Sequence, residues 1–310
     1  MRGVLRRLAV LGVLAGLASA AHAVIVAGGD GTQNTTGDGV PGWAHVGSVN
    51  GATGVYLGNG WVLTAAHVNA GTLNLPGLGN FTHIPDSVFR LVDPVTSAPT
   101  DMTMFRISGD PGLPTLTIAP FAPTQGRGVF MIGYGRNRAP AQLYWSVNTS
   151  NPSNWVWTQL SSPTGANASG YAYGPGHTKR WGSNVIDNFP GSGDVTGIIS
   201  IGFGDVRVFT TYFTNISGEG QGAPGDSGGA VFDAGGRLIG LMVAIGGYPN
   251  QPPETAVFGM ATYAADLFQY RNQIAVRINV VPEPAGLALL LPAAALAGRR
   301  HRRSRNRPCA

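Results

Sequence analysis

Gly225-Asp226-Ser227-Gly228-Gly229 is the most informative stretch of this 310-residue chain. A serine hydroxyl becomes a strong nucleophile only when a base accepts its proton, and the oxyanion that forms on attack needs aligned N–H donors. The glycines allow the backbone to turn sharply, so that the N–H groups of Gly225 and Ser227 can point at one spot. The stretch therefore predicts an activated serine with an oxyanion hole, against the alternative of an ordinary glycine-rich turn.

A base and an orienting carboxylate are found earlier in the chain. The apolar run 61–66 ends in small residues directly before His67, which leaves room for the imidazole to face a cleft. Asp101 opens a second apolar run and supplies the carboxylate that such a histidine needs for the correct tautomer and for charge stabilisation. Asp93 is the second candidate for this carboxylate, and Asp86 is the third.

The order of these residues separates two classes of serine hydrolase. The pattern Gly-x-Ser-x-Gly at 225–229 also fits the nucleophile elbow of α/β-hydrolase esterases, in which the acid and the histidine follow the serine. The only histidine after Ser227 is His301, inside an arginine-rich tail. The order histidine, aspartate, serine is therefore the one that the chain supports.

Short apolar runs alternate with turns rich in Gly, Pro, Asn and Asp, which predicts an all-β body. The expected strands are 54–57, 61–64, 128–132, 195–201, 206–213 and 238–245. A helix is expected at 262–277. The aromatic-rich region 138–193 is expected to be a loop elaboration with some strand content, and its aromatic residues are expected to pack rather than bind a ligand.

Together these motifs resemble the trypsin-like serine protease family over residues 24–278. Thr64-Ala65-Ala66-His67 matches its histidine motif, 225–229 its nucleophile motif, and the Asp101 run its aspartate motif less closely. Gly133-Tyr134-Gly135 and 238–247 also sit where the family has comparable segments. The chain departs from the family in having Val68 and Ala223 where many members have disulfide cysteines, and in a 126-residue interval between the aspartate and the serine.

The resemblance implies two packed six-stranded antiparallel β-barrels followed by a C-terminal helix. The first barrel, 24–125, would carry His67 and Asp101, and the second barrel, 126–278, would carry Ser227. The implied function is a serine endopeptidase that hydrolyses polypeptides through an acyl-enzyme and needs no cofactor or metal. The alternative is a non-catalytic surface protein on a protease-like scaffold, because fold alone does not prove activity.

The resemblance also implies a substrate pocket and an activating N-terminus. Gln221 would lie at the base of the pocket, with Val243, Ala244 and Ile245 along its wall. An uncharged residue at the bottom of the pocket predicts a neutral, small or medium-sized apolar residue before the cleaved bond. This preference would change if an acidic residue, Asp205 or Glu219, reached into the pocket. The N-terminal ammonium group of Val24, freed by cleavage of the preceding residues, would pair with Asp226. The alternative is that Val24 only begins an ordinary first strand.

Both ends of the chain predict export. Residues 1–23 have the basic start, apolar run and small-residue cleavage site of a signal peptide. Residues 279–310 resemble a PEP-CTERM sorting tail of bacteria, with Pro-Glu-Pro, an apolar stretch and an arginine cluster. A simple tail anchor is the alternative. We expect a periplasmic, cell-surface or extracellular protein that contacts the membrane transiently through this tail.

The net charge of +5 does not indicate a nucleic-acid partner. Nine of the 20 basic residues lie in the two terminal segments, which leaves 11 basic residues against all 15 acidic residues of the chain. The single cysteine, Cys309, excludes an internal disulfide and a cysteine nucleophile in the core. Nothing in the sequence indicates an oligomeric state.

Overall fold

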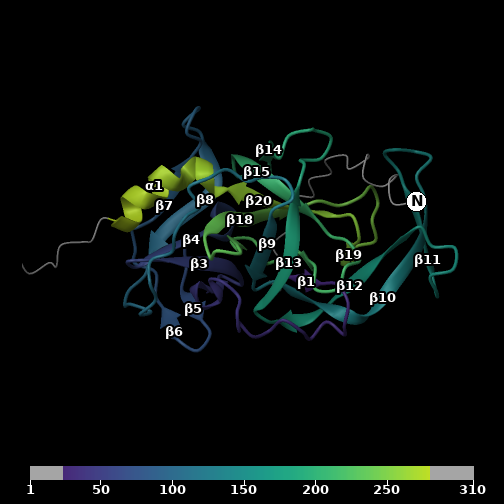
Figure 1. The fold of residues 1–310 in the computed structure, drawn as a ribbon, viewed down its shortest axis with the longest axis horizontal. Helices are drawn as coiled ribbons and strands as arrows, with labels where there is room; N and C mark the ends of the chain where they lie inside the picture. Colours follow the sequence, from purple (N-terminus) through teal and green to yellow (C-terminus); the bar gives the residue numbers. More distant parts are fainter. Residues whose placement is uncertain (1–23, 280–310) are drawn as a thin grey trace, which may run out of the picture. The chain divides into compact units, whose positions relative to one another are not determined.

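The computed structural model describes residues 24–279. The expected signal peptide and nearly all of the expected sorting tail lie outside the described residues, so both stay predictions. Within the described part, no helix is long and apolar enough to cross a membrane. The described body is built almost entirely from antiparallel strands, with one α-helix near its end, in agreement with the expected fold class (Figure 1).

The second lobe is a closed barrel of six antiparallel strands. Its strands, in the order of their pairing, are β13 (Arg180–Asp187), β9 (Gly128–Gly133), β17 (Ala230–Asp233), β18 (Leu238–Ile245), β20 (Ala261–Asp266) and β15 (Asp205–Tyr212). The ring closes where Ile186 and Asp187 of β13 pair with Thr211 and Thr210 of β15. A further strand, β14 (Thr196–Ser200), pairs with β15 and lies outside the ring.

The first lobe is a seven-stranded antiparallel sheet, one strand more than the expected six. Its order is β6 (Gly79–Phe81), β5 (Leu73–Leu75), β2 (Val46–Val49), β3 (Ala52–Gly58), β4 (Trp61–Ala65), β8 (Pro99–Arg106) and β7 (Phe89–Val92). All five residues of β4 are buried, and so is most of β8. These two central strands therefore hold the segments around His67 and Asp101 rigidly.

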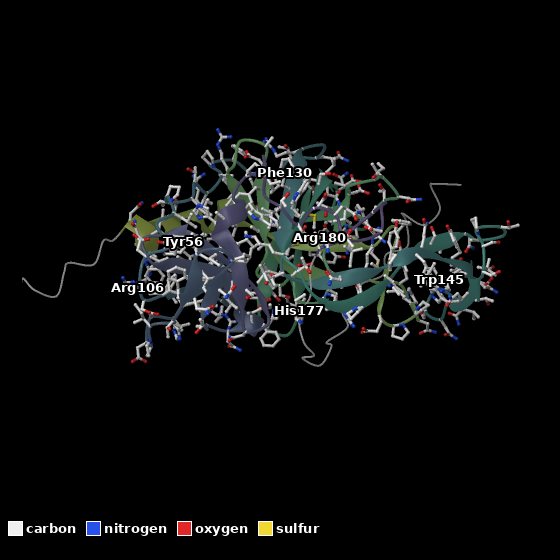
Figure 2. All side chains as sticks on the ribbon, turned by 90° about the horizontal axis from the view of Figure 1, so that it is seen from below. Tyr56, Arg106, Phe130, Trp145, His177 and Arg180 are labelled. Atoms are coloured by element: carbon white, nitrogen blue, oxygen red, sulfur yellow. The ribbon has the colours of Figure 1, made fainter. Side chains whose placement is uncertain are left out.

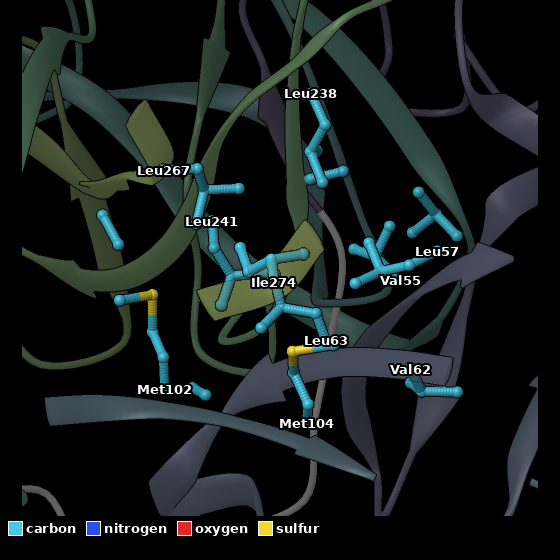
Figure 3. Packing of buried hydrophobic residues seen from close by; sticks show 14 of the residues in the cluster. Val55, Leu57, Val62, Leu63, Met102, Met104, Leu238, Leu241, Leu267 and Ile274 are labelled. Atoms are coloured by element: carbon cyan, nitrogen blue, oxygen red, sulfur yellow. The ribbon is translucent and has the colours of Figure 1, made fainter. Parts of the chain in front are cut away.

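One hydrophobic core joins the two lobes. Met102 and Leu63 of the first lobe belong to the same buried cluster as Leu241 of the second lobe and Ile274 of the helix (Figure 3). Burial of apolar side chains is the main favourable term in folding, so this shared core fixes the lobes against each other. The interface between them is therefore a rigid place for a site assembled from both.

The helix α1 (Leu267–Asn279) begins later than expected. Residues 262–266, which we expected to start the helix, instead complete β20 in the barrel. Asp266 ends the strand and caps the helix, since its Oδ1 accepts a 3.1 Å hydrogen bond from the N–H of Phe268. Pairing with β15 and β18 outweighed the helical pattern here, because tertiary contacts override local propensity.

Much of the region 138–193 forms strands rather than loops. The strands β10 (Arg136–Asn148), β11 (Val156–Leu160), β12 (Ala168–His177) and β19 (Thr255–Val257) make an accessory four-stranded sheet in the order β11-β10-β12-β19. Trp145 and Trp155 are buried in it, which agrees with the expected packing role, and Trp145 lies well away from Tyr56 of the first lobe (Figure 2). A short ribbon of β1 (Ile25–Val26) and β16 (Gly220–Gln221) completes the fold.

Candidate active site

The structure places His67 and Asp101 in direct contact. His67 follows β4 in a single 3-10 turn, Ala66–Val68, and β8 pairs with β4 so that Met102 lies opposite Ala65. The Nδ1–H of His67 donates to Oδ2 of Asp101 at 2.7 Å, and the backbone N–H of His67 donates to Oδ1 at 2.9 Å. Asp101 is fully buried. Its two oxygens orient the ring, and the lone pair of Nε2 is left to accept a proton.

The two alternative carboxylates lie elsewhere. Asp93 caps a turn, in which its Oδ1 accepts hydrogen bonds from the N–H groups of Thr96 and Val95. The bond from Thr96 contributes most to a lowered pKa of Asp93. Asp86 is exposed in a turn and has a positive φ of 59°. Neither carboxylate bonds to His67, whereas Asp101 does.

The serine loop is fastened to the first lobe through Thr53. The Oγ1–H of Thr53 donates to the carbonyl of Gly225 at 2.9 Å, and the N–H of Thr53 donates to the carbonyl of Ser227 at 3.1 Å. Thr64 in turn donates from Oγ1 to the carbonyl of Thr53 at 2.6 Å, three residues before His67. This chain of bonds connects the serine loop directly to the strands that carry the histidine.

The backbone of the serine loop requires glycine at specific positions. Gly225 and Gly228 have φ angles of 92° and 83°, in the left-handed region that residues with a side chain rarely adopt. A Cβ on Gly228 would also lie 2.1 Å from the carbonyl oxygen of Thr53. Among the described residues, the N–H groups of Gly225 and Ser227 have no acceptor, so both are available to an oxyanion.

Asp226 is a buried carboxylate beside the serine. Its Oδ1 accepts from the N–H of Gly135 and its Oδ2 from the N–H of Ala223, each at 2.8 Å. Burial raises the pKa of Asp226 to about 8, although these two hydrogen bonds and the charge of Arg180 lower it. No ion pair involves Asp226 in the described part of the chain. Two backbone N–H groups therefore hold this carboxylate in place.

The expected pocket residues converge beside the serine loop. Gln221 is fully buried, its Nε2 donates to the carbonyl of Ala261 at 3.2 Å, and its Oε1 is a buried acceptor without a partner. Ile245, at the end of β18, and Thr262 lie close to Gly222. A Cβ on Gly222 would meet the Cγ2 atoms of Thr262 and Ile245 at 3.0 and 3.1 Å. Gly222, next to Gln221, is therefore packed tightly against both residues.

The two other wall residues and the two acidic alternatives are also located. Val243 is buried and Ala244 is half-buried on β18. Glu219 is bound to the N–H and hydroxyl of Thr214, and burial raises its pKa. Asp205 is exposed at the start of β15. These contacts hold the carboxylate of Glu219 on Thr214.

Three residues of the site were missed by sequence reasoning. Thr53 and Thr64 are polar residues inside buried strands, a signal that could have been noticed because a buried hydroxyl needs a partner. Phe203 lies over His67, with a ring-centroid distance of 5.5 Å and an interplanar angle of 46°. No sequence pattern marks Phe203, because its turn comes from the other lobe.

Residues 24–279 contain no group of three or more His, Cys, Asp or Glu side chains that could hold a metal ion. The chemistry that Ser227, His67 and Asp101 support is that of a serine, a histidine and a carboxylate. Such a set performs acyl transfer with a covalent intermediate.

The comparison with protein families agrees with the architecture. The family model of the trypsin-like peptidase domain matches residues 52–241, which include all three candidate catalytic residues. No curated protein matches the chain. Similar solved structures include an inactive form of Rv3671c from M. tuberculosis, with 18% identity, 85% of this chain and 100% of that chain covered, and a TM-score of 0.44.

Two further solved structures are similar at comparable levels. A Glu endopeptidase in complex with MPD has 13% identity, with 82% of this chain and 99% of that chain covered, and a TM-score of 0.47. Kallikrein-related peptidase 10 has 16% identity, with 77% of this chain and 97% of that chain covered, and a TM-score of 0.42.

Proposed function

The chain belongs to the trypsin-like peptidase domain family, and from this premise we propose that it is an exported serine endopeptidase. The observation that carries the proposal is the bidentate contact between His67 and Asp101, next to a serine loop whose oxyanion donors are free. A non-catalytic scaffold has no need of this combination, because each part serves only the transfer of a proton and the stabilisation of an oxyanion.

In the proposed reaction, Nε2 of His67 accepts the proton of Ser227 while Oγ forms a bond to the carbonyl carbon of the substrate. The N–H groups of Gly225 and Ser227 stabilise the oxyanion. His67 then gives the proton to the leaving amine as the C–N bond breaks, which leaves an acyl-enzyme. A water molecule, deprotonated by the same histidine, releases the acid. Asp101 stabilises the imidazolium in both halves of the reaction.

The proposed preference is for a small, uncharged residue before the cleaved bond. Gln221 is uncharged and fully buried, and the proposed wall residue Ile245 packs closely on the neighbouring Gly222. The accessory sheet backs this wall, because Ile245 packs against its aromatic cluster and the Nε1–H of Trp157 donates to the carbonyl of Pro249 at 3.0 Å. One methylene group more or less in a hydrophobic pocket changes the free energy of transition-state binding by about 1–3 kcal/mol.

The proposed location outside the cytoplasm rests on the two terminal segments of the sequence. A signal peptide at 1–23 and a PEP-CTERM-type tail at 279–310 would export the enzyme and contact the membrane transiently. Intact-mass measurement of the exported protein tests both. We expect a chain that starts at Val24 and lacks the residues after about Glu283, whereas a mass that includes 285–310 would instead show a retained anchor.

Activity is tested directly with the mature chain. We expect casein to be degraded and Ser227 to be labelled by a fluorophosphonate probe, with Ser227→Ala as the matched control for both. Labelling without casein degradation would indicate a narrow substrate preference. Absence of both, in a folded protein, would favour the non-catalytic scaffold and overturn the proposal.

A further inference from the structure

One strand of the accessory sheet has a free edge. The sheet order β11-β10-β12-β19 puts β11 and β19 at its two sides. The strand β19 is three residues long and fully buried, whereas every residue of the five-residue β11 is exposed or half-buried. Among residues 24–279, only β10 pairs with β11. The side of β11 that faces away from β10, called here the β11 edge, therefore presents N–H and C=O groups that another strand can bind.

The β11 edge has none of the features that usually prevent pairing between edges. Proteins protect free edges with charged side chains, proline, bulges or very short strands. Residues 139–178 contain no Asp, Glu, Lys or Arg, although 11% of the chain is charged. The strand contains no proline, and its five pairs with β10 follow one another without a register shift. The β11 edge is therefore regular, uncharged and long enough to pair.

The edge strands of the two lobes are protected where β11 is not. In the first lobe, β7 carries Arg90, and β6 is only three residues long. In the second lobe, β14 has a carboxylate beside each end, because Asp194 precedes it by two residues and Asp205 lies opposite Ser200. The lack of charge is therefore a particular property of the β11 edge.

The strand β11 is held firmly on one face and exposed on the other. The ring of Trp157 lies 5.9 Å from the ring of the buried Trp145. Because side chains alternate across a strand, Val156, Thr158 and Leu160 share the opposite face. Val156 is 58% exposed. In Figure 1, β11 lies at the end of the second lobe that faces away from β3 and β4, so a second molecule can approach it.

The sequence of β11 is complementary to itself. When two β11 strands pair in antiparallel fashion about Thr158, Val156 lies opposite the partner's Leu160, and Trp157 lies opposite the partner's Gln159. Thr158 lies opposite the partner's Thr158. Apolar pairs and Thr–Thr pairs stabilise antiparallel strands. A two-fold axis relates such strands, and two-fold symmetry is the commonest symmetry of protein oligomers.

We propose that β11 pairs with β11 of a second copy of this chain, so that two accessory sheets join into one continuous antiparallel sheet. The lack of charge favours this partner, because two identical charged edges would repel each other, while an uncharged edge offers nothing to a charged peptide. The interface does not include the serine loop. The dimer therefore goes beyond the proposed peptidase function and does not depend on it.

Sedimentation velocity of the mature Ser227→Ala chain, which cannot digest itself, tests the association. Because the interface is small, we expect the mass to rise from one chain to two between about 1 and 100 μM. Thr158→Lys puts two lysines opposite each other and should weaken the dimer about tenfold or more. Ile198→Lys is the matched control, because it adds the same charge at a 52% exposed residue of the edge strand β14. A single-chain mass at every concentration overturns the inference and leaves the β11 edge to a peptide of another protein. Equal weakening by both lysines also overturns it.

Disulfide formation tests the register, in a chain whose single native cysteine is removed by Cys309→Ser. Opposite residues of an antiparallel pair have Cα atoms about 4.5–5.5 Å apart, within the range of a disulfide. Thr158→Cys should therefore give a covalent dimer in oxidised glutathione. Val156→Cys alone should not, because the two positions lie four residues, about 14 Å, apart along the strands. A mixture of Val156→Cys and Leu160→Cys chains should again cross-link. Failure of Thr158→Cys to cross-link, or equal cross-linking by Val156→Cys alone, overturns the proposed pairing.

Discussion

The hydroxyl of Thr53 donates a 2.9 Å hydrogen bond to the carbonyl of Gly225, which joins β3 of the first lobe to the serine loop of the second. The same Oγ1 accepts from the N–H of Tyr134 at 2.9 Å. Because the histidine and the serine come from different lobes, their mutual position depends on contacts of this kind. Thr53 makes three of them, two through its side chain and one through its backbone N–H to Ser227.

Thr53→Val removes the hydroxyl and keeps the shape of the side chain. It leaves the carbonyl of Gly225 and the N–H of Tyr134 without their partner, which should cost about 1–3 kcal/mol of unfolding free energy. We expect kcat/KM to fall about tenfold or more, because the serine loop loses its attachment. Thr53→Ser retains the hydroxyl and serves as the control. Equal activity of the valine and serine variants, measured with one peptide ester, would contradict this role.

The three candidate catalytic residues should act as a unit. Ser227→Ala and His67→Ala should each lower kcat by about 10⁵–10⁶, with the double variant little worse than either. Asp101→Asn should cost about 10⁴, because the amide favours the wrong tautomer of His67. Asp93→Asn is the matched control, since Asp93 only caps a turn. Full activity of Asp101→Asn with loss in Asp93→Asn would transfer the role to Asp93.

The proposed place of Ile245 in the pocket wall predicts that shortening this side chain changes the residue preferred before the cleaved bond. Ile245→Ala should shift the preferred residue before the cleaved bond from alanine-sized to leucine-sized side chains, with a change of about tenfold or more in their kcat/KM ratio. A peptide library with this position varied measures the shift. Ile216→Ala, at a 65% exposed residue, is the control. A library dominated by arginine or lysine in the unaltered enzyme would contradict the neutral pocket.

The sequence predicted three of the six barrel strands of the second lobe, β9, β15 and β18, because their patterns are local, but it did not predict β13, β17 and β20. The run 238–245 is β18 with the same bounds, and the glycines at 225 and 228 have the positive φ angles that a sharp turn needs. The helix start was wrong because residues 262–266 carry apolar residues that fit both a strand and a helix. Only the pairing of β20 with two neighbours decides between them.

The parts of the site that could not be predicted depend on contacts between distant segments. Phe203 reaches His67 across 136 positions of sequence, and Arg90 reaches Phe203 across 113. Neither residue belongs to a motif, and a charged or aromatic residue in a loop has many possible partners. The accessory sheet was underestimated for a related reason, since its glycine, serine and asparagine content resembles that of loops while its strands are long.

The pKa of Asp226 predicts a pH-dependent stability in a chain with residues ahead of Val24. The carboxyl titrates near pH 4 when unfolded and at about 8 when folded, so between these values the native state holds a proton that the unfolded state lacks. The free energy of unfolding should therefore fall as pH rises through this window, by at most about 1.4 kcal/mol per pH unit. Asp226→Asn should remove this dependence of the unfolding free energy on pH. The asparagine amide nitrogen would face a backbone N–H donor, which should lower the stability at every pH. Urea unfolding at pH 5–8 measures both slopes, and equal slopes would contradict the prediction.

The N-terminus is the candidate partner for Asp226. In the register of β1, Ile25 lies opposite Gln221. The preceding residue, Val24, is fully buried against Gly182, because a Cβ added to Gly182 would lie 3.3 Å from Cγ1 of Val24. Gly133 lies directly under Asp226, since a Cβ there would be 2.0 Å from Oδ1.

These two glycines are neighbours in the barrel. Gly182 lies two residues from Arg180 on β13, and Arg180 pairs with Gly133. Residues two apart on a strand share a face and lie about 7 Å apart along it, so Val24 at Gly182 and Asp226 at Gly133 approach the same face of the β9–β13 pair. We therefore expect a free ammonium group at Val24 to pair with this carboxylate.

Signal cleavage after Ala23 would then activate the enzyme without a separate propeptide. A buried carboxylate is strongly destabilised without a partner, and pairing with the ammonium of Val24 should keep Asp226 ionised and hold the oxyanion loop. We expect kcat/KM to be about tenfold or more higher for a chain that begins at Val24 than for a chain with a few added residues before it. Asp226→Asn should reduce this difference. Active-site titration with a fluorophosphonate controls for the amount of folded enzyme. If the extended chain is equally active, the terminus is not the switch, and Arg180, the cation opposite Gly133, becomes the residue to substitute next.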